Sequence, residues 1–405
     1  MKRKLIMFIL ATIFIAVSIS RASKIDRMQK IVDVAIGKYH TLCLFEDGRI
    51  LAFGDNENGE LGLGEFFLGE RYVSPFYIQA PIKFVSIASG YFHSLAVSED
   101  GTLWGWGDNS SCQLINSERN FSKSCTESEY NIPVIIDSEK DWRKVFADGF
   151  DSFGLKKDGT LWRISDMCQI ENPKGRKWKN VIVQADGGGD DYKLYVMLED
   201  KNGEIFTYGT CNEERNMLSC FSVWSSKKDG LKILLPLETP PEISDLWMND
   251  FSGVFRKRNE IHIWGMIATE ENEIKEKFKS MFSDIRKSEE IFADWMFKSK
   301  KKVKIKKIKK IISGNFMWSF ACIGGAEFNY SYTACLRNDG KLIVWSNGKT
   351  YTSDSSLKIR DIWGNNGIFA QAKDGKIYVT GYNLFNRLGV DKSQEEFLFL
   401  ELFDY

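Results

Sequence analysis

The feature that most constrains this 405-residue chain is a hairpin signature that recurs seven times. In each copy, a turn of two residues separates two short runs of strand-forming residues. Glycine at such a turn adopts positive φ at little steric cost, which a tight hairpin requires. The turns are Asp47-Gly48, Asp100-Gly101, Asp158-Gly159, Asn202-Gly203, Arg258-Asn259, Asp339-Gly340 and Asp374-Gly375. In the degenerate fifth copy, Asn259 is expected to supply the left-handed residue.

The residues that follow each turn align without gaps. Five positions after the turn glycine, or after Asn259, most copies have a large residue. Six positions after it, all seven copies have glycine or serine. The two sets are Phe53, Trp106, Ile164, Tyr208, Trp264, Trp345 and Thr380, and Gly54, Gly107, Ser165, Gly209, Gly265, Ser346 and Gly381. A large residue beside a small one suits sheets that pack face to face. The recurrence predicts a repeat architecture.

Each copy is also preceded by a strand-like run. These runs begin at Ile31, Phe84, Trp142, Trp178, Ile243, Ile308 and Ile359. Their residues are apolar on both faces, as expected for strands that are covered on both sides. A fourth strand can form from the variable segment before the next copy. Because a closed ring has no exposed sheet edge at its seam, the last unit is expected to recruit a terminal strand, and residues 397–403 are the candidate.

Two copies carry a more specific pattern. Residues 87–96 (IASGYFHSLA), followed by Asp100-Gly101 and residues 104–109, resemble the regulator of chromosome condensation repeat, and so do residues 54–56 and 59–62. The resemblance extends in outline over residues 31–390. Members of that family form seven-bladed β-propellers, so the resemblance implies an all-β fold of that kind. The expected repeats are residues 31–80, 81–140, 141–177, 178–240, 241–300, 301–356 and 357–405, within one domain of residues 23–405.

The first 22 residues have the pattern of a secretory signal peptide. A basic start, Lys2-Arg3-Lys4, precedes an apolar run over residues 5–19, and Ser20-Arg21-Ala22 ends the segment. The apolar run is too short for a typical membrane span. We therefore expect a secreted or periplasmic protein of a bacterial type, with no membrane span after cleavage. The alternative is an uncleaved membrane anchor. The remaining chain is weakly acidic, which does not favour nucleic acid as a partner.

The cysteines suggest two local disulfides. Cys112 and Cys125 flank one loop, and Cys211 and Cys220 flank another, so each pair is expected to bond in an oxidising compartment. Cys43 and Cys335 occupy one repeat position that otherwise takes small residues, and we expect them to be buried in the core. The chain has three histidines and no Cys-x-x-Cys. No metal site and no cofactor are therefore predicted.

Two insertions interrupt the repeat, a polar loop over residues 113–131 and a longer segment over residues 269–298, which is followed by a lysine-rich run. Residues 269–298 place apolar side chains at helical spacing, which predicts a helical insertion that either packs on the propeller or forms a partner-binding arm. Residues 298–310 (KSKKKVKIKKIKK) are rich in lysine. We interpret this run as an outer strand whose exposed edge is protected by charge, with an anionic surface partner as the alternative.

No catalytic constellation is visible in the sequence, so the chain is not expected to be an enzyme. His40 and His93 are repeat equivalents, which suggests structural side chains held by backbone hydrogen bonds. The variable residues after the first strand of each copy are more informative, because equivalent propeller loops collect on one end. The predicted partner-binding residues are Tyr39, Tyr91, Phe92, Phe150, Asp151, Asp190, Phe251, Phe316, Trp318 and Asn365. Alternatively, these aromatics fold over the channel and close the core.

These observations lead to one preferred hypothesis and two rivals. The preferred hypothesis is a monomeric, non-catalytic propeller that binds another protein through aromatic side chains with a polar rim. The resemblance also implies a possible guanine-nucleotide exchange role on a small GTPase, as in the founding member of the family. The third hypothesis is a carbohydrate-binding or enzymatic propeller, because glycans stack on the same kinds of side chain.

Overall fold

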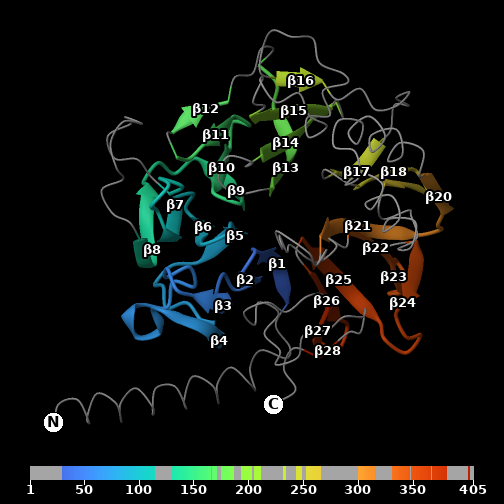
Figure 1. Cartoon of the computed structure of the whole chain (residues 1–405), viewed down its shortest axis with the longest axis horizontal. Helices are drawn as coiled ribbons and strands as arrows, with labels where there is room; N and C mark the ends of the chain where they lie inside the picture. Colours follow the sequence, from blue (N-terminus) through green and yellow to red (C-terminus); the bar gives the residue numbers. More distant parts are fainter. Residues whose placement is uncertain are drawn as a thin grey trace, which may run out of the picture.

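The described residues form a ring of seven four-stranded antiparallel sheets in the computed structural model (Figure 1). The structure describes residues 30–114, 129–165, 167–170, 175–186, 193–202, 205–210, 231–233, 243–248, 252–265, 300–315, 331–346, 348–365, 367–380 and 400–401. Each sheet is a meander of four consecutive strands, and its first strand lies nearest the centre of the ring. The predicted all-β, seven-bladed propeller is confirmed.

The blades are numbered in chain order. Blade 1 contains β1 (Ile31–Ile36), β2 (His40–Phe45), β3 (Ile50–Asn56) and β4 (Glu70–Tyr77), with a short 3₁₀ helix, η2 (Glu65–Phe67), before β4. Blade 2 contains β5 (Phe84–Ser89), β6 (His93–Ser98), β7 (Leu103–Asp108) and β8 (Glu129–Asp137). Blade 3 contains β9 (Trp142–Asp148), β10 (Asp151–Lys156), β11 (Leu161–Arg163) and β12 (Cys168–Gln169).

The other four blades follow the same order. Blade 4 contains β13 (Trp178–Asp186), β14 (Lys193–Asp200), β15 (Ile205–Thr210) and β16 (Leu231–Ile233). Blade 5 contains β17 (Ile243–Met248), β18 (Ser252–Lys257), β19 (Glu260–Gly265) and β20 (Lys300–Lys304). Blade 6 contains β21 (Ile308–Asn315), β22 (Ser331–Arg337), β23 (Leu342–Ser346) and β24 (Lys349–Thr352), and blade 7 contains β25 (Ile359–Gly364), β26 (Ile368–Ala372), β27 (Ile377–Thr380) and β28 (Leu400–Glu401).

All seven first strands begin at the residues that the repeat alignment predicted. The predicted closing strand is also present, because β28 lies within residues 397–403 and pairs with β27 in blade 7. Blade 7 then packs against blade 1 through a cluster that includes Phe53 and Phe369, whose ring centroids are 6.1 Å apart. The signal peptide (residues 1–22) and the helical insertion (residues 269–298) lie outside the described residues.

The recurring Asp-Gly turns connect neighbouring blades. Gly48 has φ +86° and closes a three-residue loop, while the Asp47 carboxylate accepts the backbone N–H of Arg49 at 3.1 Å. The Gly48 carbonyl accepts the N–H of Phe84, the first residue of the next blade, at 2.9 Å. The equivalent bonds join Gly101 to Trp142, Gly159 to Trp178 and Gly340 to Ile359, at 3.0–3.3 Å. The turn that defines the repeat therefore also fixes the spacing between blades.

The degenerate fifth turn differs from its prediction. Lys257 pairs directly with Glu260, so Arg258 and Asn259 form a two-residue loop. Arg258 has φ +55°, and Asn259 does not adopt a positive φ. The prediction that Asn259 is the left-handed residue is wrong by one position. The shorter loop explains the difference, because a two-residue hairpin of type II′ needs positive φ at its first position, whereas a three-residue loop needs it at the last.

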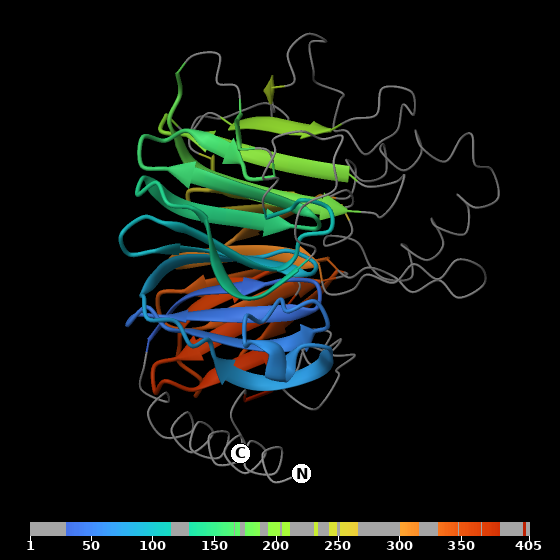
Figure 2. The same ribbon diagram turned by 90° about the vertical axis from the view of Figure 1, so that its left-hand side faces the viewer.

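The core is distributed between the blades and is not gathered at the centre. Figure 2 shows the ring edge-on, with neighbouring sheets stacked face to face. Trp106, five positions after its turn glycine, is fully buried in the cluster between blades 1 and 2. β2 and β3 are buried along their whole length, as the apolar pattern predicted. The thiols of Cys43 and Cys335 are also buried, as expected for small core residues.

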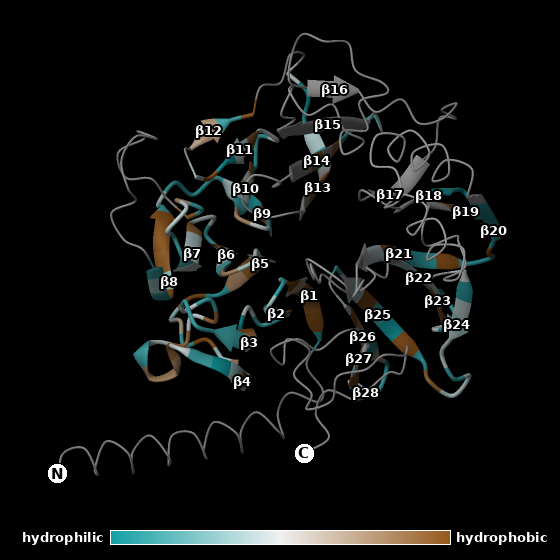
Figure 3. Cartoon of the chain, in the orientation of Figure 1, coloured by the Kyte–Doolittle hydropathy of each residue, from teal (hydrophilic) through white to brown (hydrophobic). Residues whose placement is uncertain are grey.

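The outer strands differ in polarity (Figure 3). On β8 the side chains of Ile132 and Ile135 are exposed, whereas on β20 the exposed side chains are Lys302 and Lys304. The lysine run is therefore divided between the edge strand β20 and the first strand of blade 6. Charge along an unpaired edge disfavours strand addition by another chain, which is the role predicted for this run. Within the described residues, no helix is long and apolar enough to cross a membrane.

The predicted disulfides are only partly within the described residues. Cys112 is disulfide-bonded, and its partner lies outside them. Cys125, Cys211 and Cys220 also lie outside them, so both pairings stay predictions.

His40 and His93 link each of the first two blades to the next one. His40 Nε2 lies 2.8 Å from Ser94 Oγ, and His93 Nε2 lies 2.7 Å from Ser152 Oγ. Ser94 donates its hydroxyl hydrogen to the Glu60 carbonyl at 2.8 Å, so His40 Nε2 must be the donor to Ser94. The structural role predicted for both histidines is confirmed, and His40 has a backbone hydrogen bond with Tyr91, but serine side chains are additional partners that were not expected. The Nε2 atoms bond serine side chains on the adjacent blade because the rings reach across the interface.

Replacing Ser152 by alanine is expected to lower the free energy of unfolding by about 1–3 kcal/mol, because the buried His93 ring loses its partner. Urea denaturation followed by tryptophan fluorescence measures the loss. Ser110→Ala is the matched control, since Ser110 is exposed and its hydroxyl contacts Asp108 at the surface. Equal losses in the two variants would contradict a specific role for the bond between His93 and Ser152.

Candidate interaction surface

Four of the predicted aromatic residues come together where the first and second strands of blades 1, 2 and 3 are joined. Tyr39 stacks on Phe92 with ring centroids 5.0 Å apart, and Tyr91 packs edge-on against Phe150 at 5.2 Å. Phe92 lies 6.4 Å from both Tyr91 and Phe150. These four side chains, from three successive blades, are called the aromatic cluster below.

Backbone bonds between the loops hold the aromatic cluster in place. The N–H of Tyr91 donates to the Gly149 carbonyl of blade 3 at 2.8 Å, and the N–H of Lys38 donates to the Gly90 carbonyl of blade 2 at 3.4 Å. A Cβ on Gly90 would lie 2.2 Å from His93 Cε1, so only glycine allows the backbone at position 90 to lie this close to the His93 ring. The loops are therefore positioned by the same contacts that join the blades.

The four rings differ in exposure. Tyr91 is only 6% exposed and forms the base of the cluster, whereas Tyr39, Phe92 and Phe150 are half-buried. Of these four described rings, only Tyr91 is buried in the way that the alternative prediction requires. Lys38 adds a positive charge, with its Nζ 4.4 Å from the centroid of the Tyr91 ring. Lys38 is not among the predicted binding residues, although its place beside Tyr39 in the variable loop could have identified it.

The other predicted residues are more scattered. Asp151 opens β10 directly after Phe150 and is the strand partner of Asp148. Asn365 lines the cavity on the ring axis, where its side-chain amide donates to the Ile36 carbonyl at 3.4 Å. Residues Asp190, Phe251, Phe316 and Trp318 lie outside the described residues.

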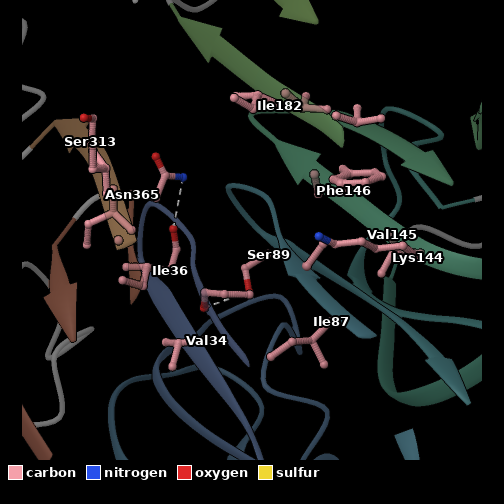
Figure 4. A pocket seen from close by; sticks show the side chains of 18 residues that line it. Val34, Ile36, Ile87, Ser89, Lys144, Val145, Phe146, Ile182, Ser313 and Asn365 are labelled. Atoms are coloured by element: carbon pink, nitrogen blue, oxygen red, sulfur yellow. Dashed lines mark hydrogen bonds between the residues drawn. The ribbon is translucent and has the colours of Figure 1, made fainter. Parts of the chain in front are cut away.

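A cavity of about 340 Å³ lies on the ring axis and is lined by first strands of the blades (Figure 4). Most of its lining residues have aliphatic side chains, and Lys144 is the only charged residue among the described lining residues. Near this wall, burial raises the pKa of Asp33, while the Lys144 ammonium opposes the rise. Within the described residues, no group of three His, Cys, Asp or Glu side chains could hold a metal ion. The described residues of this region offer a binding surface and a cavity on the ring axis.

Comparisons with known proteins agree with the repeat. A family model of the regulator of chromosome condensation (RCC1) repeat matches residues 31–60 and 84–113, and a second model with the same description matches residues 47–97. These segments coincide with blades 1 and 2, and the other five blades repeat their four-stranded order. Blades 1 and 2 therefore carry RCC1 repeats. The seven blades and the glycine-dependent junctions between them fit this repeat.

The matched relatives are longer proteins. The chain is 33% identical over 139 residues to the probable E3 ubiquitin-protein ligase HERC6 of Homo sapiens, which is 34% of this chain and 13% of HERC6. It is 32% identical over 208 residues to the probable E3 ubiquitin-protein ligase HERC4 of Rattus norvegicus, which is 46% of this chain and 19% of HERC4. The matched part is therefore less than a fifth of each ligase.

Solved structures are similar in fold at low sequence identity. Human WBSCR16 matches with a TM-score of 0.50 and 12% identity, covering 93% of this chain and 83% of that chain. Prp20p from Saccharomyces cerevisiae matches with a TM-score of 0.43 and 13% identity, covering 93% of this chain and 77% of that chain. At this identity, the likeness of WBSCR16 supports the propeller fold alone.

Proposed function

We propose that this RCC1 repeat propeller is a non-catalytic scaffold that binds another protein through the aromatic cluster. The observation that carries the proposal is the stacked pair Tyr39 and Phe92, half-buried at the junction of two blades. Aromatic side chains fixed on a rigid frame supply large contact area with little loss of conformational entropy on binding. Lys38 and Asp151 provide polar groups beside these rings, as in the rim of a protein interface.

The test of the proposal is site-specific photocrosslinking followed by measurement of affinity. A photoreactive amino acid at position 92 should capture a defined protein, whereas the same amino acid at position 66 should not. Phe66 is the matched control because it is 60% exposed, on η2 of blade 1, and lies outside the aromatic cluster. Capture at both positions, or at neither, would contradict the proposed surface.

Replacing Tyr39 and Phe92 together by alanine is expected to weaken the captured complex at least tenfold, because aromatic anchors at interfaces contribute about 1–3 kcal/mol each. Isothermal titration calorimetry with the captured protein measures the change. Phe66→Ala should leave the affinity within about twofold. If Phe66→Ala weakens binding as much as the double variant, the aromatic cluster is not the binding surface.

The location of the protein also belongs to this proposal. We propose that residues 1–22 direct the chain to the periplasm or the medium, where the partner is encountered, and that the chain acts as a monomer. The basic start and short apolar run of this segment support export. N-terminal sequencing of protein recovered from the medium or the periplasm should show a chain beginning near residue 23. A chain that retains residue 1 and stays with the membrane would support an anchor instead.

A further inference from the structure

The loops that follow the third strands of blades 1 and 2 have equivalent hydrogen bonds, with one exception. In blade 1 the N–H of Leu61 donates to Asn56 Oδ1 at 2.9 Å, and in blade 2 the N–H of Leu114 donates to Asn109 Oδ1 at 3.0 Å. Gly59 and Cys112, which are also equivalent, both have positive φ, +77° and +58°. Residues 55–61 therefore correspond one by one to residues 108–114.

The exception concerns Glu60 and its equivalent, Gln113. Gln113 Oε1 accepts the N–H of Ser111 at 2.9 Å, and its Nε2 donates to Asp108 Oδ2 at 2.7 Å. Glu60 Oε2 likewise accepts a backbone N–H, from Asn58, at 2.8 Å. However, Glu60 Oε1 is buried and has no hydrogen-bond partner. This oxygen corresponds to the Gln113 nitrogen, and the aspartate that corresponds to Asp108 is Asp55.

An ionised glutamate is a poor fit to this position. Glu60 is fully buried and Asp55 is 2% exposed, so two adjacent carboxylates would be shielded from water. Burying a carboxylate with one oxygen left without a donor, beside a second carboxylate, is costly, and a proton on one carboxyl group removes this cost. A protonated Glu60 would regain the donor that glutamine supplies in blade 2. We propose that Glu60 is protonated at neutral pH and that its carboxyl group donates a hydrogen bond to Asp55. The stability of the junction of blades 1 and 2 then depends on this proton.

The electrostatic surroundings agree with this geometry. Burial raises the pKa of Glu60 to about 8, Asp55 and Glu57 add to the rise, and hydrogen bonds from the backbone of Glu60 and Asn58 oppose it without cancelling it. Burial also raises the pKa of Asp55 to about 6. The nearby cation is Arg71 from β4, and its Nη2 donates to Glu57 Oε2 at 2.7 Å. From blade 2, the groups that contact the Glu60 backbone are uncharged, namely the hydroxyl of Ser94 and the indole of Trp106.

Glu60 lies at the junction of blades 1 and 2, so its protonation affects the stability of this junction. The Glu60 carbonyl accepts from Ser94 Oγ at 2.8 Å and from Trp106 Nε1 at 2.9 Å, and both donors belong to blade 2. Between pH 4.5, the unperturbed value for glutamate, and about 8, the folded protein binds a proton that the unfolded chain has released. Stability attributable to Glu60 therefore falls as pH rises across this window and is constant above it.

Glu60→Gln tests the proposal, because glutamine is already accommodated at the equivalent position. The ratio of the unfolding constant of the wild type to that of the variant is expected to increase with pH, by up to about tenfold per unit between pH 5 and pH 8. Urea denaturation at a series of pH values measures the ratio. The matched variant Gln113→Glu should create a new pH dependence of the same sign in blade 2. A ratio that does not change with pH would overturn the proposal.

A second measurement is made on the wild-type protein, and a variant serves only to assign the signal. Infrared spectra of the wild type, with glutamate isotopically labelled, should show the carbonyl stretch of a protonated glutamate at pH 6.5 that disappears at pH 9.5. The band should be absent in Glu60→Gln. Absence of a protonated glutamate in the folded wild type at pH 6.5 would equally overturn the proposal.

Discussion

Replacing Gly107 by alanine is expected to lower the free energy of unfolding by about 2–5 kcal/mol. Gly107 has φ +91°, a conformation that L residues with a side chain rarely adopt. A Cβ there would lie 2.4 Å from the Phe92 carbonyl oxygen and 3.0 Å from Glu60 Cα. These are backbone atoms of blades 2 and 1, so relief of the clash requires movement of the junction itself. Urea denaturation at neutral pH measures the loss.

Gly69→Ala separates the two causes of this loss. Gly69 has a nearly identical φ of +86°, but a Cβ there would meet nothing within 4 Å. Its replacement is therefore expected to cost only the backbone term, about 1–2 kcal/mol. The difference between the two variants gives the free energy of close packing at the blade junction. If both variants lose the same stability, the junction adjusts freely and the packing argument is wrong.

The fold could be predicted from the sequence because the repeat combines local and long-range information. The turn at Asp47-Gly48 fixes a hairpin locally, and its recurrence fixes the number of blades. Even the closing strand β28 was predictable, since a ring leaves no edge unpaired at its seam. The error at Arg258 arose because loop length, which decides where positive φ is needed, depends on strand register. Composition alone does not reveal that register.

The candidate site was less predictable. The convergence of Tyr39 and Phe92 followed from topology, because loops of one kind collect on one end of a propeller. The burial of Tyr91 and the position of Lys38 over its ring depend on the tilt of neighbouring blades, which the repeat does not encode. The sequence shows that blade 1 has glutamate at position 60 where blade 2 has glutamine at the equivalent position 113. The consequence of this difference appears only when the hydrogen bonds of the two loops are compared.

Acidification from pH 7 to pH 5 is expected to remove roughly 3–4 kcal/mol of the stability contributed by His40 and His93 together. Burial lowers the pKa of His40 to about 3 and that of His93 to about 4, and both side chains are fully buried. In the unfolded chain both rings take up a proton near pH 6.5. The folded state therefore binds fewer protons between pH 6.5 and about 4, and its stability falls as pH falls through this window.

Variants isolate this contribution from that of Glu60, which acts in the opposite direction over the same range. In His40→Gln the amide group can replace the Nε2 donor to Ser94 and does not titrate. The variant should therefore lose about 2 kcal/mol less than the wild type between pH 7 and pH 5, as measured by urea denaturation. His262→Gln is the comparison variant: burial also lowers the pKa of His262, but this half-buried ring on β19 takes no part in the serine links, so its replacement should reduce the acid sensitivity less than His40→Gln does.

The comparison between His40→Gln and His262→Gln decides whether the blade junctions account for acid sensitivity. His40 Nε2 must donate to Ser94, because the single Ser94 hydrogen is directed to the Glu60 carbonyl. Protonation of the His40 ring keeps this bond but adds a charge in a site closed to water, beside His93, which disfavours it further. Equal acid sensitivity in His40→Gln and the wild type would mean that the ring is not held neutral. The cost would then have to come from carboxylates elsewhere in the ring of blades.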